Sequence, residues 1–129
     1  MAKIGQYEEL EVWQMGMNLC EKIYDLTNNS DLAKDFSLRD QIRRSSISVP
    51  SNIAESFERN SEKQFIYFLI ISKGSCGELR TQLNLANRLK YINENEYKFL
   101  NDSCLSISKQ LSGFINYLKT RDKKIDKVK

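Results

Sequence analysis

The sequence of 129 residues contains no histidine. This absence excludes a Ser-His-Asp or Cys-His nucleophile pair, an HExxH zinc site and an ExxH di-iron half-site, because each requires an imidazole. It also removes the side chain that most often acts as general base near pH 7. The sequence contains no other catalytic constellation, metal-ligand spacing or cofactor motif. We therefore expect a protein that is not an enzyme, holds no cofactor or metal and has no small-molecule substrate.

Proline and glycine are also scarce, with one proline and five glycines. A β-sandwich needs many tight turns, so this composition favours long helices with short connections. The longest apolar run is Phe68–Ile71, far shorter than the ~20 residues that span a bilayer. The first residues are polar and lack the apolar region of a signal peptide. We expect a cytoplasmic protein that is not associated with a membrane.

The three cysteines are far apart and form no CxxC pair. Cys20, Cys76 and Cys104 each fall on a hydrophobic stripe of a predicted helix. This pattern is typical of buried free thiols, and it indicates a reducing intracellular compartment.

The net charge of +3 is concentrated at the C-terminus. Residues 119–129 hold six Lys or Arg and two Asp, a net of +4, which leaves −1 for residues 1–118. We interpret residues 120–129 as a basic, flexible tail that follows a single domain of residues 7–119. The alternative is an arm that binds nucleic acid.

Hydrophobic periodicity predicts four helices, at about residues 7–27, 37–57, 62–90 and 95–119. The loops between them are short, so neighbouring helices should be antiparallel, and the sequence predicts an all-α, up-down-up-down four-helix bundle. In the fourth helix the apolar residues alternate in steps of three and four, which is the pattern of bundle packing. They are Tyr97, Leu100, Cys104, Ile107, Leu111, Phe114 and Leu118.

The second helix has Ser37 as an expected N-cap, with Asp40 three positions later. Pro50 lies in its middle, where proline removes an amide donor and clashes with the carbonyl of Ser46, so we expect a kink. Hydroxyls of neighbouring serines could bond the freed carbonyls. Two shorter helices split at Val49–Pro50 are the alternative.

The third helix contains Gly74 and Gly77, each of which costs about 1 kcal/mol relative to alanine in a helix interior. Close approach of another backbone would compensate; a weak point in the helix is the alternative. Some apolar residues lie outside the main stripes, which predicts a self-association surface. They are Ile66, Tyr67, Ile70 and Ile71 in the third helix and Val12, Leu19 and Leu26 in the first.

The most informative string is Leu38-Arg-Asp-Gln-Ile-Arg-Arg-Ser-Ser-Ile-Ser-Val-Pro-Ser-Asn-Ile-Ala-Glu-Ser56. With Leu10-Glu-Val-Trp-Gln14, Arg59 and Gly74-Ser-Cys-Gly-Glu-Leu79, it resembles the four-helix-bundle proteins encoded in intervening sequences of bacterial large-subunit ribosomal RNA. The resemblance covers roughly residues 7–118.

The resemblance implies a compact bundle that assembles as a closed homo-pentameric ring. It also implies a similarity to the accessory proteins of diversity-generating retroelements, which assist a reverse transcriptase and bind nucleic acid. The resemblance implies no enzymatic activity. The family usually has glycine after Asn-Ile-Ala-Glu and often two residues later, where this chain has Ser56 and Glu58, so we expect the helix to continue to about Phe57.

Arg39, Arg43, Arg44 and Arg59 are the candidate RNA-binding residues. A ring of five copies would gather arginines into a band for phosphates. The alternative is local ion pairing at i,i+4 spacing, from Asp35 to Arg39 and from Asp40 to Arg44. Arg43 has no acid four residues before it, so it is the best single candidate.

Asn52 and Glu55 lie shortly after the proline, around the expected kink. A surface salt bridge from Glu55 to Arg59 is one interpretation. The other is a buried polar network with Pro50 that fixes helix or subunit register. Taken together, these features predict an oligomeric bundle that binds structured RNA or a ribonucleoprotein. The alternative is a protein–protein adaptor, or an accessory subunit of a reverse transcriptase, without RNA binding of its own.

Overall fold

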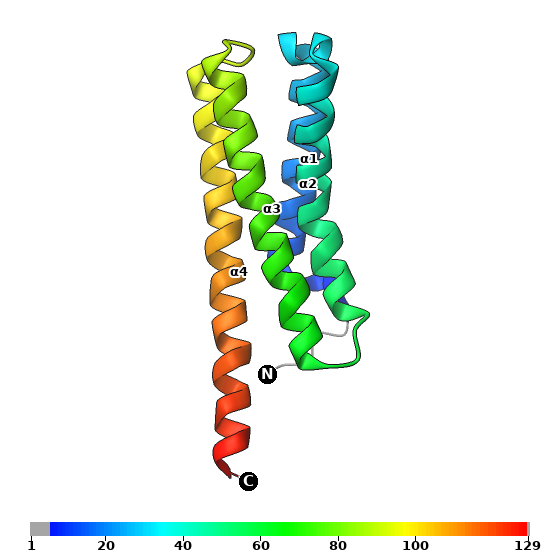
Figure 1. The fold of residues 1–129 in the computed structure, drawn as a ribbon, viewed down its shortest axis with the longest axis vertical. Helices are drawn as coiled ribbons and strands as arrows, with labels where there is room; N and C mark the ends of the chain where they lie inside the picture. Colours follow the sequence, from blue (N-terminus) through cyan, green and yellow to red (C-terminus); the bar gives the residue numbers. More distant parts are fainter. Residues whose placement is uncertain (1–5, 129) are drawn as a thin grey trace.

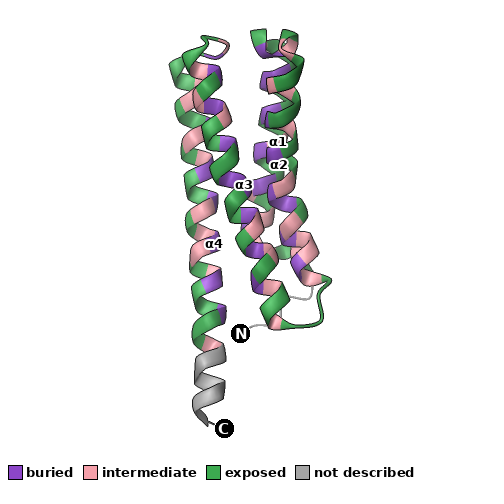
Figure 2. Ribbon diagram, in the orientation of Figure 1, coloured by how far each residue is buried: buried purple, intermediate pink, exposed green. Residues whose placement is uncertain are grey.

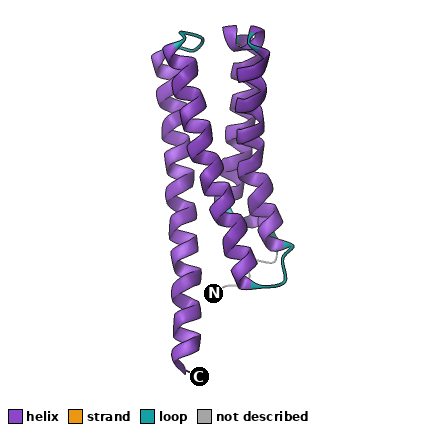
Figure 3. Cartoon of the chain, in the orientation of Figure 1, coloured by secondary structure: helices purple, strands orange, loops and turns teal. Residues whose placement is uncertain are grey.

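The structure is a computed structural model that describes residues 6–128, with side chains described for residues 6–121. Four long helices and two short 3-10 helices make up this part of the chain, and Figure 3 shows helices and loops with no strand among the described residues. In order they are η1 (Tyr7–Glu9), α1 (Glu11–Asn29), η2 (Asp31–Lys34), α2 (Phe36–Phe57), α3 (Glu62–Arg88) and α4 (Glu94–Val128).

The four long helices run alternately up and down, as Figure 1 shows, so the predicted topology is confirmed. The α2–α3 contact is the most extensive, followed by α3–α4 and α1–α2, while α1 and α4 touch less. The bundle is therefore most open along the α1–α4 side. Buried positions line the sides of the helices that face one another (Figure 2).

The apolar stripe of α4 enters the core as the 3–4 alternation predicts. Five of its seven residues are buried, and Tyr97 and Phe114 are half-buried. They pack with fully buried residues from the rest of the chain. The largest of these are Ile23, Leu32, Ile42, Ile53, Leu69, Leu79 and Leu83.

The assignment of stripes in α1 is wrong. Val12, Leu19 and Leu26 were expected outside the main stripe of this helix, but they belong to the chain's own core. Met17 and Tyr24, which lie on the apolar stripe beside them, are exposed instead. The physical reason is that both stripes are apolar and adjacent, so periodicity identifies the wide apolar side of the helix but not the line that faces the other helices.

The N-cap of helix α2 lies two residues earlier than expected. Asp35, rather than Ser37, is the N-cap, and its carboxylate accepts a hydrogen bond from the backbone N–H of Leu38 at 3.1 Å. The helix is continuous through Pro50, which excludes the split into two shorter helices. The Ser46 carbonyl, which a proline four residues later cannot satisfy, instead accepts a hydrogen bond from the Cys20 thiol at 3.1 Å.

Helices α3 and α4 begin with side-chain caps. Ser61 caps α3 by accepting from the N–H of Gln64 at 3.1 Å. Asn93 and Glu96 form a reciprocal capping box at the start of α4, with bonds of 2.8 and 2.9 Å. Lys90 follows α3 with φ of 63°, a left-handed conformation that usually takes glycine.

Helix α4 extends to Val128, past the expected end near Lys119. Figure 1 shows its C-terminal end reaching beyond the ends of the other helices. The side chains of residues 122–128, and residue 129 altogether, lie outside the described residues. The flexible tail expected at residues 120–129 therefore stays a prediction.

Candidate functional site

A line of small polar side chains joins α2 to α3 beside Pro50. The hydroxyls of Ser48 and Ser75 lie 2.7 Å apart, and the Ser72 hydroxyl donates to the Val49 carbonyl at 2.7 Å. The Asn52 amide donates to the carbonyl and the hydroxyl of Ser48, at 2.8 and 2.9 Å. Asn52 thus belongs to a polar link between two helices of the same chain.

Glu55 does not join this network. Its carboxylate pairs with Arg59 one turn later, and this surface salt bridge is the simpler of the two interpretations of the sequence. The guanidinium of Arg59 also lies over the ring of Phe68, 4.3 Å from its centroid. Both contacts hold the side chain at the end of α2.

Arg43 is the most firmly anchored of the candidate arginines. Its Nε donates to the Thr27 hydroxyl at 2.8 Å, and a terminal nitrogen donates to the Asn28 side-chain oxygen at 2.6 Å. The guanidinium also lies 4.5 Å from the centroid of the Tyr24 ring. Arg43 therefore fastens the start of α2 to the end of α1.

Arg39 is held in a similar way by its surroundings. It pairs with Asp40 at 3.0 Å, donates to the Ala33 carbonyl at 3.4 Å and lies 4.8 Å from the centroid of the Phe36 ring. The expected i,i+4 pair with Asp35 does not form, because the Asp35 carboxylate caps the helix instead.

The second oxygen of Asp35 accepts a hydrogen bond from the Tyr91 hydroxyl at 3.1 Å, and this bond raises the pKa of Tyr91. Arg44 lacks the expected partner, because Asp40 is turned toward Arg39. Arg44 is exposed and makes no hydrogen bond or ion pair with another residue in the described part of the chain.

The four candidate arginines do not form one cluster. Arg39, Arg43 and Arg44 lie in the first turns of α2, whereas Arg59 follows its C-terminal end. Eighteen residues of helix separate Arg39 from Phe57 at the end of α2, which corresponds to about 27 Å. Of the four candidates, only the three at the start of α2 lie close enough together to contact neighbouring phosphates.

The exposed side of α3 carries Tyr67, Ile70, Gly74 and Gly77, which we call the α3 outer face. Tyr67 is 58% exposed and Ile70 is 47% exposed. A Cβ added at either glycine would meet no atom within 4 Å, so neither glycine is needed for packing inside this chain. Ile66 does not share this face, because it lies in the chain's own core.

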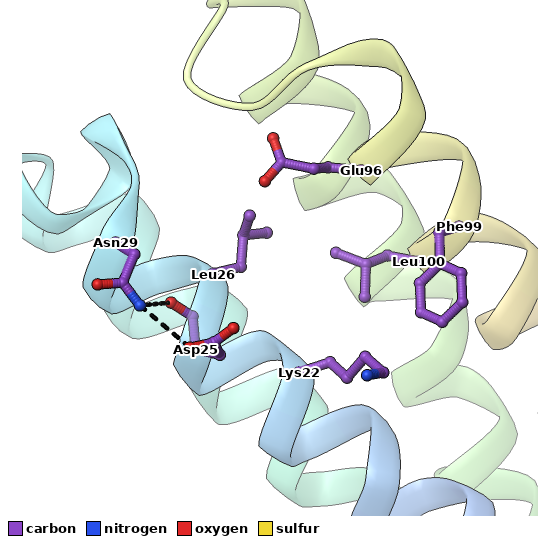
Figure 4. A pocket seen from close by; sticks show the side chains of 7 residues that line it. All are labelled: Lys22, Asp25, Leu26, Asn29, Glu96, Phe99 and Leu100. Atoms are coloured by element: carbon purple, nitrogen blue, oxygen red, sulfur yellow. Dashed lines mark hydrogen bonds between the residues drawn. The ribbon is translucent and has the colours of Figure 1, made fainter.

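Two adjacent cavities follow the open α1–α4 side, with volumes of about 190 and 370 Å³. Figure 4 shows the first of them, where the Lys22 ammonium lies 5.7 Å from the centroid of the Phe99 ring and Asn29 donates to Asp25. Its walls combine Leu26 and Leu100 with charges of both signs.

A groove of about 580 Å³ lies between α3 and α4. The sequence patterns described above do not predict it. Arg80, Asn84 and Arg88 line it from α3, and Tyr97 and Asn101 from α4. The signal that could have revealed the groove is the four-residue spacing of these polar residues, because that spacing places them on one side of each helix.

The thiols match the expectation from the sequence. Cys20, Cys76 and Cys104 are free; Cys20 is half-buried and the other two are buried. Burial raises the pKa of Cys20, that of Cys76 to about 11 and that of Cys104 to about 12. A raised pKa keeps these thiols protonated near neutral pH, whereas the thiolate is the nucleophilic form.

The described residues contain no group of three or more His, Cys, Asp or Glu side chains that could hold a metal ion. Among the same residues, no helix is both long and apolar enough to span a membrane.

Comparison with known proteins shows the family to which the chain belongs. A comparison with curated protein sequences gave no match. One similar solved structure is a protein of unknown function from the S23 ribosomal protein family of Bacteroides thetaiotaomicron, with 29% sequence identity and a TM-score of 0.74. The match covers 81% of this chain and 97% of that one. Residues 8–113 match the profile of the 23S rRNA-intervening sequence proteins, and the chain belongs to that family.

Proposed function

We propose that this chain is a non-enzymatic helical bundle that self-associates through the α3 outer face and binds RNA as an assembly. The observation that carries the proposal is the pair of exposed glycines inside a long helix. Gly74 and Gly77 each cost about 1 kcal/mol of helix stability relative to alanine, and no contact within the chain compensates for it.

The apolar side chains beside these glycines support a second copy as the partner. Tyr67, Ile70, Gly74 and Gly77 follow one another in steps of three, four and three, the spacing of a helix–helix seam. Glycines in such a seam allow a second backbone to approach closely, and the flanking side chains of Tyr67 and Ile70 would then lose their exposure to water. A ring of five copies is the assembly that we expect.

The RNA-binding part of the proposal rests on charge. Arg44 is exposed and unpaired within the described residues, and residues 119–129 carry a net charge of +4 at the end of the chain. Assembly would multiply both features. Arg39 and Arg43 contribute positive potential, although their hydrogen-bonding groups are largely used within the chain. The free thiols fit a reducing cytoplasm.

The family supports an RNA context through its description as proteins of the 23S rRNA intervening sequence. Whether the ligand is that RNA, or an RNA handled by a reverse transcriptase, is a question for the binding experiment. A protein that assembles but binds no RNA would be an adaptor.

The test compares two isoleucines of similar exposure. Ile70→Asp should shift the mass measured by light scattering toward that of a single chain, because a charge would be buried in the seam. Ile47→Asp on α2 is the matched control, and it should leave the mass unchanged. Equal masses for the parent and Ile70→Asp would refute the proposed interface.

RNA binding is measured separately on the assembled parent by fluorescence anisotropy with a structured RNA. Affinity should fall steeply between ~50 and ~200 mM salt, because counterions are released from the phosphates. No binding at the lower salt would contradict the RNA-binding part of the proposal and favour the adaptor.

A further inference from the structure

The groove between α3 and α4 holds two arginines in fixed positions. Arg80 Nε donates to the side-chain oxygen of Asn101 at 3.0 Å, and Arg88 Nε donates to that of Asn84 at 2.9 Å. The amide of Asn84 in turn donates to the Tyr97 hydroxyl at 2.8 Å. Each guanidinium is therefore oriented through its Nε, and the partner of Arg88 is itself held by Tyr97.

The terminal nitrogens of both guanidinium groups remain available. Within the described residues, neither Arg80 nor Arg88 has an ion-pair partner, and the only hydrogen bond that each makes uses Nε. A guanidinium whose two terminal nitrogens are free presents one paired N–H edge, which matches the paired oxygens of a phosphate or carboxylate. Because the geometry exists before binding, little side-chain entropy is lost when an anion arrives.

The charge of the groove selects an anion. None of the residues that line it is acidic. Two acids of α4, Glu96 and Asp102, line the cavities on the α1 side of that helix instead. The groove is thus a local positive region on a bundle whose residues 1–118 carry a net charge of −1.

The spacing of the arginines indicates a ligand with more than one anionic group. Arg80 and Arg88 are eight residues apart on α3, which places their Cα atoms about 12 Å apart along the axis. Two arginines at different positions along the groove suit a ligand that has an anionic group for each of them. A polyanionic strand that follows the groove can contact both, and the Thr81 hydroxyl and the free amide of Asn101 lie along the same path.

We infer that this groove is a site where the phosphate backbone of RNA binds, with Arg80 and Arg88 as the two phosphate contacts. The inference rests on the proposed RNA-binding function and gives it a location that differs from the arginines of α2. The groove and the α3 outer face meet at Gly77, and the groove continues toward the C-terminal end of α3, away from Tyr67 and Ile70. Gly77 would thus be shared by the seam and the edge of the groove.

The test measures binding of a fluorescent structured RNA to the full chain across a series of salt concentrations. For Arg80→Gln/Arg88→Gln, affinity at ~100 mM salt should fall at least tenfold, and the slope of log K against log salt should decrease by about 1.4–1.8, the value for two lost phosphate contacts. The RNA affinity of Arg80→Lys/Arg88→Lys should lie between those of this variant and the parent. Lysine keeps the charge but loses the planar guanidinium and its Nε hydrogen bond to asparagine.

The matched control is Lys63→Gln/Lys109→Gln, which removes the same charge from exposed positions outside the groove. It should bind within about twofold of the parent. Light scattering and thermal unfolding of every variant establish that mass and folding are unchanged. Competition with inorganic phosphate and with a mononucleotide distinguishes an RNA backbone from a small phosphate ligand, which should displace RNA only at far higher concentration.

The outcomes separate the two proposals. If the parent binds RNA and Arg80→Gln/Arg88→Gln binds with the same affinity and salt slope, the groove is not the site while RNA binding stands. If a mononucleotide displaces RNA at equal concentration, the ligand is a small phosphate compound and the inference is overturned. If the parent binds no RNA at ~50 mM salt, the proposed function and this site fail together.

Discussion

Gly16 of α1 lies directly against Pro50 of α2. A Cβ at position 16 would come within 3.3 Å of the Pro50 Cβ and 3.4 Å of its Cδ. The proline ring thus occupies the space that a side chain on α1 would need. One turn further along α1, the Cys20 thiol donates to the Ser46 carbonyl that Pro50 leaves without its helical partner. Pro50 is accommodated by α1 as well as by its own helix.

Gly16→Ala should therefore destabilise the fold by about 1–2 kcal/mol, although alanine is the better helix former. The neighbour at this position is a rigid ring within a helix, so it has little freedom to move aside. Urea unfolding measures the difference. Gly113→Ala is the control, because a Cβ there meets nothing within 4 Å. Equal stability changes for the two variants would show that the Pro50 contact is not tight.

Gly74→Ala should act in opposite directions on the helix and on the assembly. The variant removes a helix-interior glycine, so the single chain should gain up to about 1 kcal/mol. The added methyl group would separate two closely packed helices, so the dissociation constant of the assembly should rise at least tenfold. Thermal unfolding of the dissociated chain and sedimentation across concentrations measure the two effects. Gly113→Ala should stabilise the single chain without weakening the assembly. If Gly74→Ala both stabilises the single chain and strengthens the assembly, the proposed seam is wrong.

Much of the fold follows from local signals in the sequence. The Asn93–Glu96 capping box and the 3–4 alternation of α4 are satisfied almost entirely by neighbouring residues, so periodicity and capping rules locate them. The cap of α2 shows where local capping rules fail to choose between two candidates. Asp35 and Ser37 are both good N-caps, and Asp35 is held in place by Tyr91, a residue far along the chain.

The candidate sites depend still more on distant contacts. Spacing alone pairs Arg39 with Asp35, whereas the folded chain turns Asp35 to the helix end and Arg39 to Asp40. The partners of Arg43 lie on α1, so rules based on i,i+4 spacing within one helix cannot identify them. Likewise, Arg80 becomes part of a groove only because α4 brings Asn101 beside it.

Lys90→Gly should stabilise the protein by about 1 kcal/mol, because lysine at positive φ carries a steric penalty that glycine does not. The expected increase in melting temperature is about 3–5 °C. Lys90→Ala keeps the Cβ and the penalty, so its melting temperature should stay near that of the parent. A Lys90→Gly melting temperature at or below the parent value would contradict this account of the α3–α4 turn.

The buried thiols predict a loss of stability at alkaline pH. The Cys104 thiol has a pKa of about 12 in the folded protein against an ordinary value of 9.0, because burial disfavours the thiolate. The unfolded chain therefore loses this proton first, and stability falls as the pH rises above 9. Between pH 8 and pH 10 the contribution from Cys104 is about 1 kcal/mol.

Urea unfolding of the parent and of Cys104→Ala at the two pH values measures this contribution. The variant begins from lower stability because of the small cavity, but it should lose about 1 kcal/mol less between pH 8 and pH 10. Parallel losses in the two proteins would show that the Cys104 thiol does not titrate differently on folding.

The central claim is that several copies of this chain act together on RNA. The most direct test is light scattering of the full chain, at micromolar concentration and ~50 mM salt, with and without a short structured RNA. The account predicts a protein mass several times 15.1 kDa, and a single species containing that assembly and RNA when the two are mixed. A protein of 15.1 kDa that elutes apart from the RNA would contradict it.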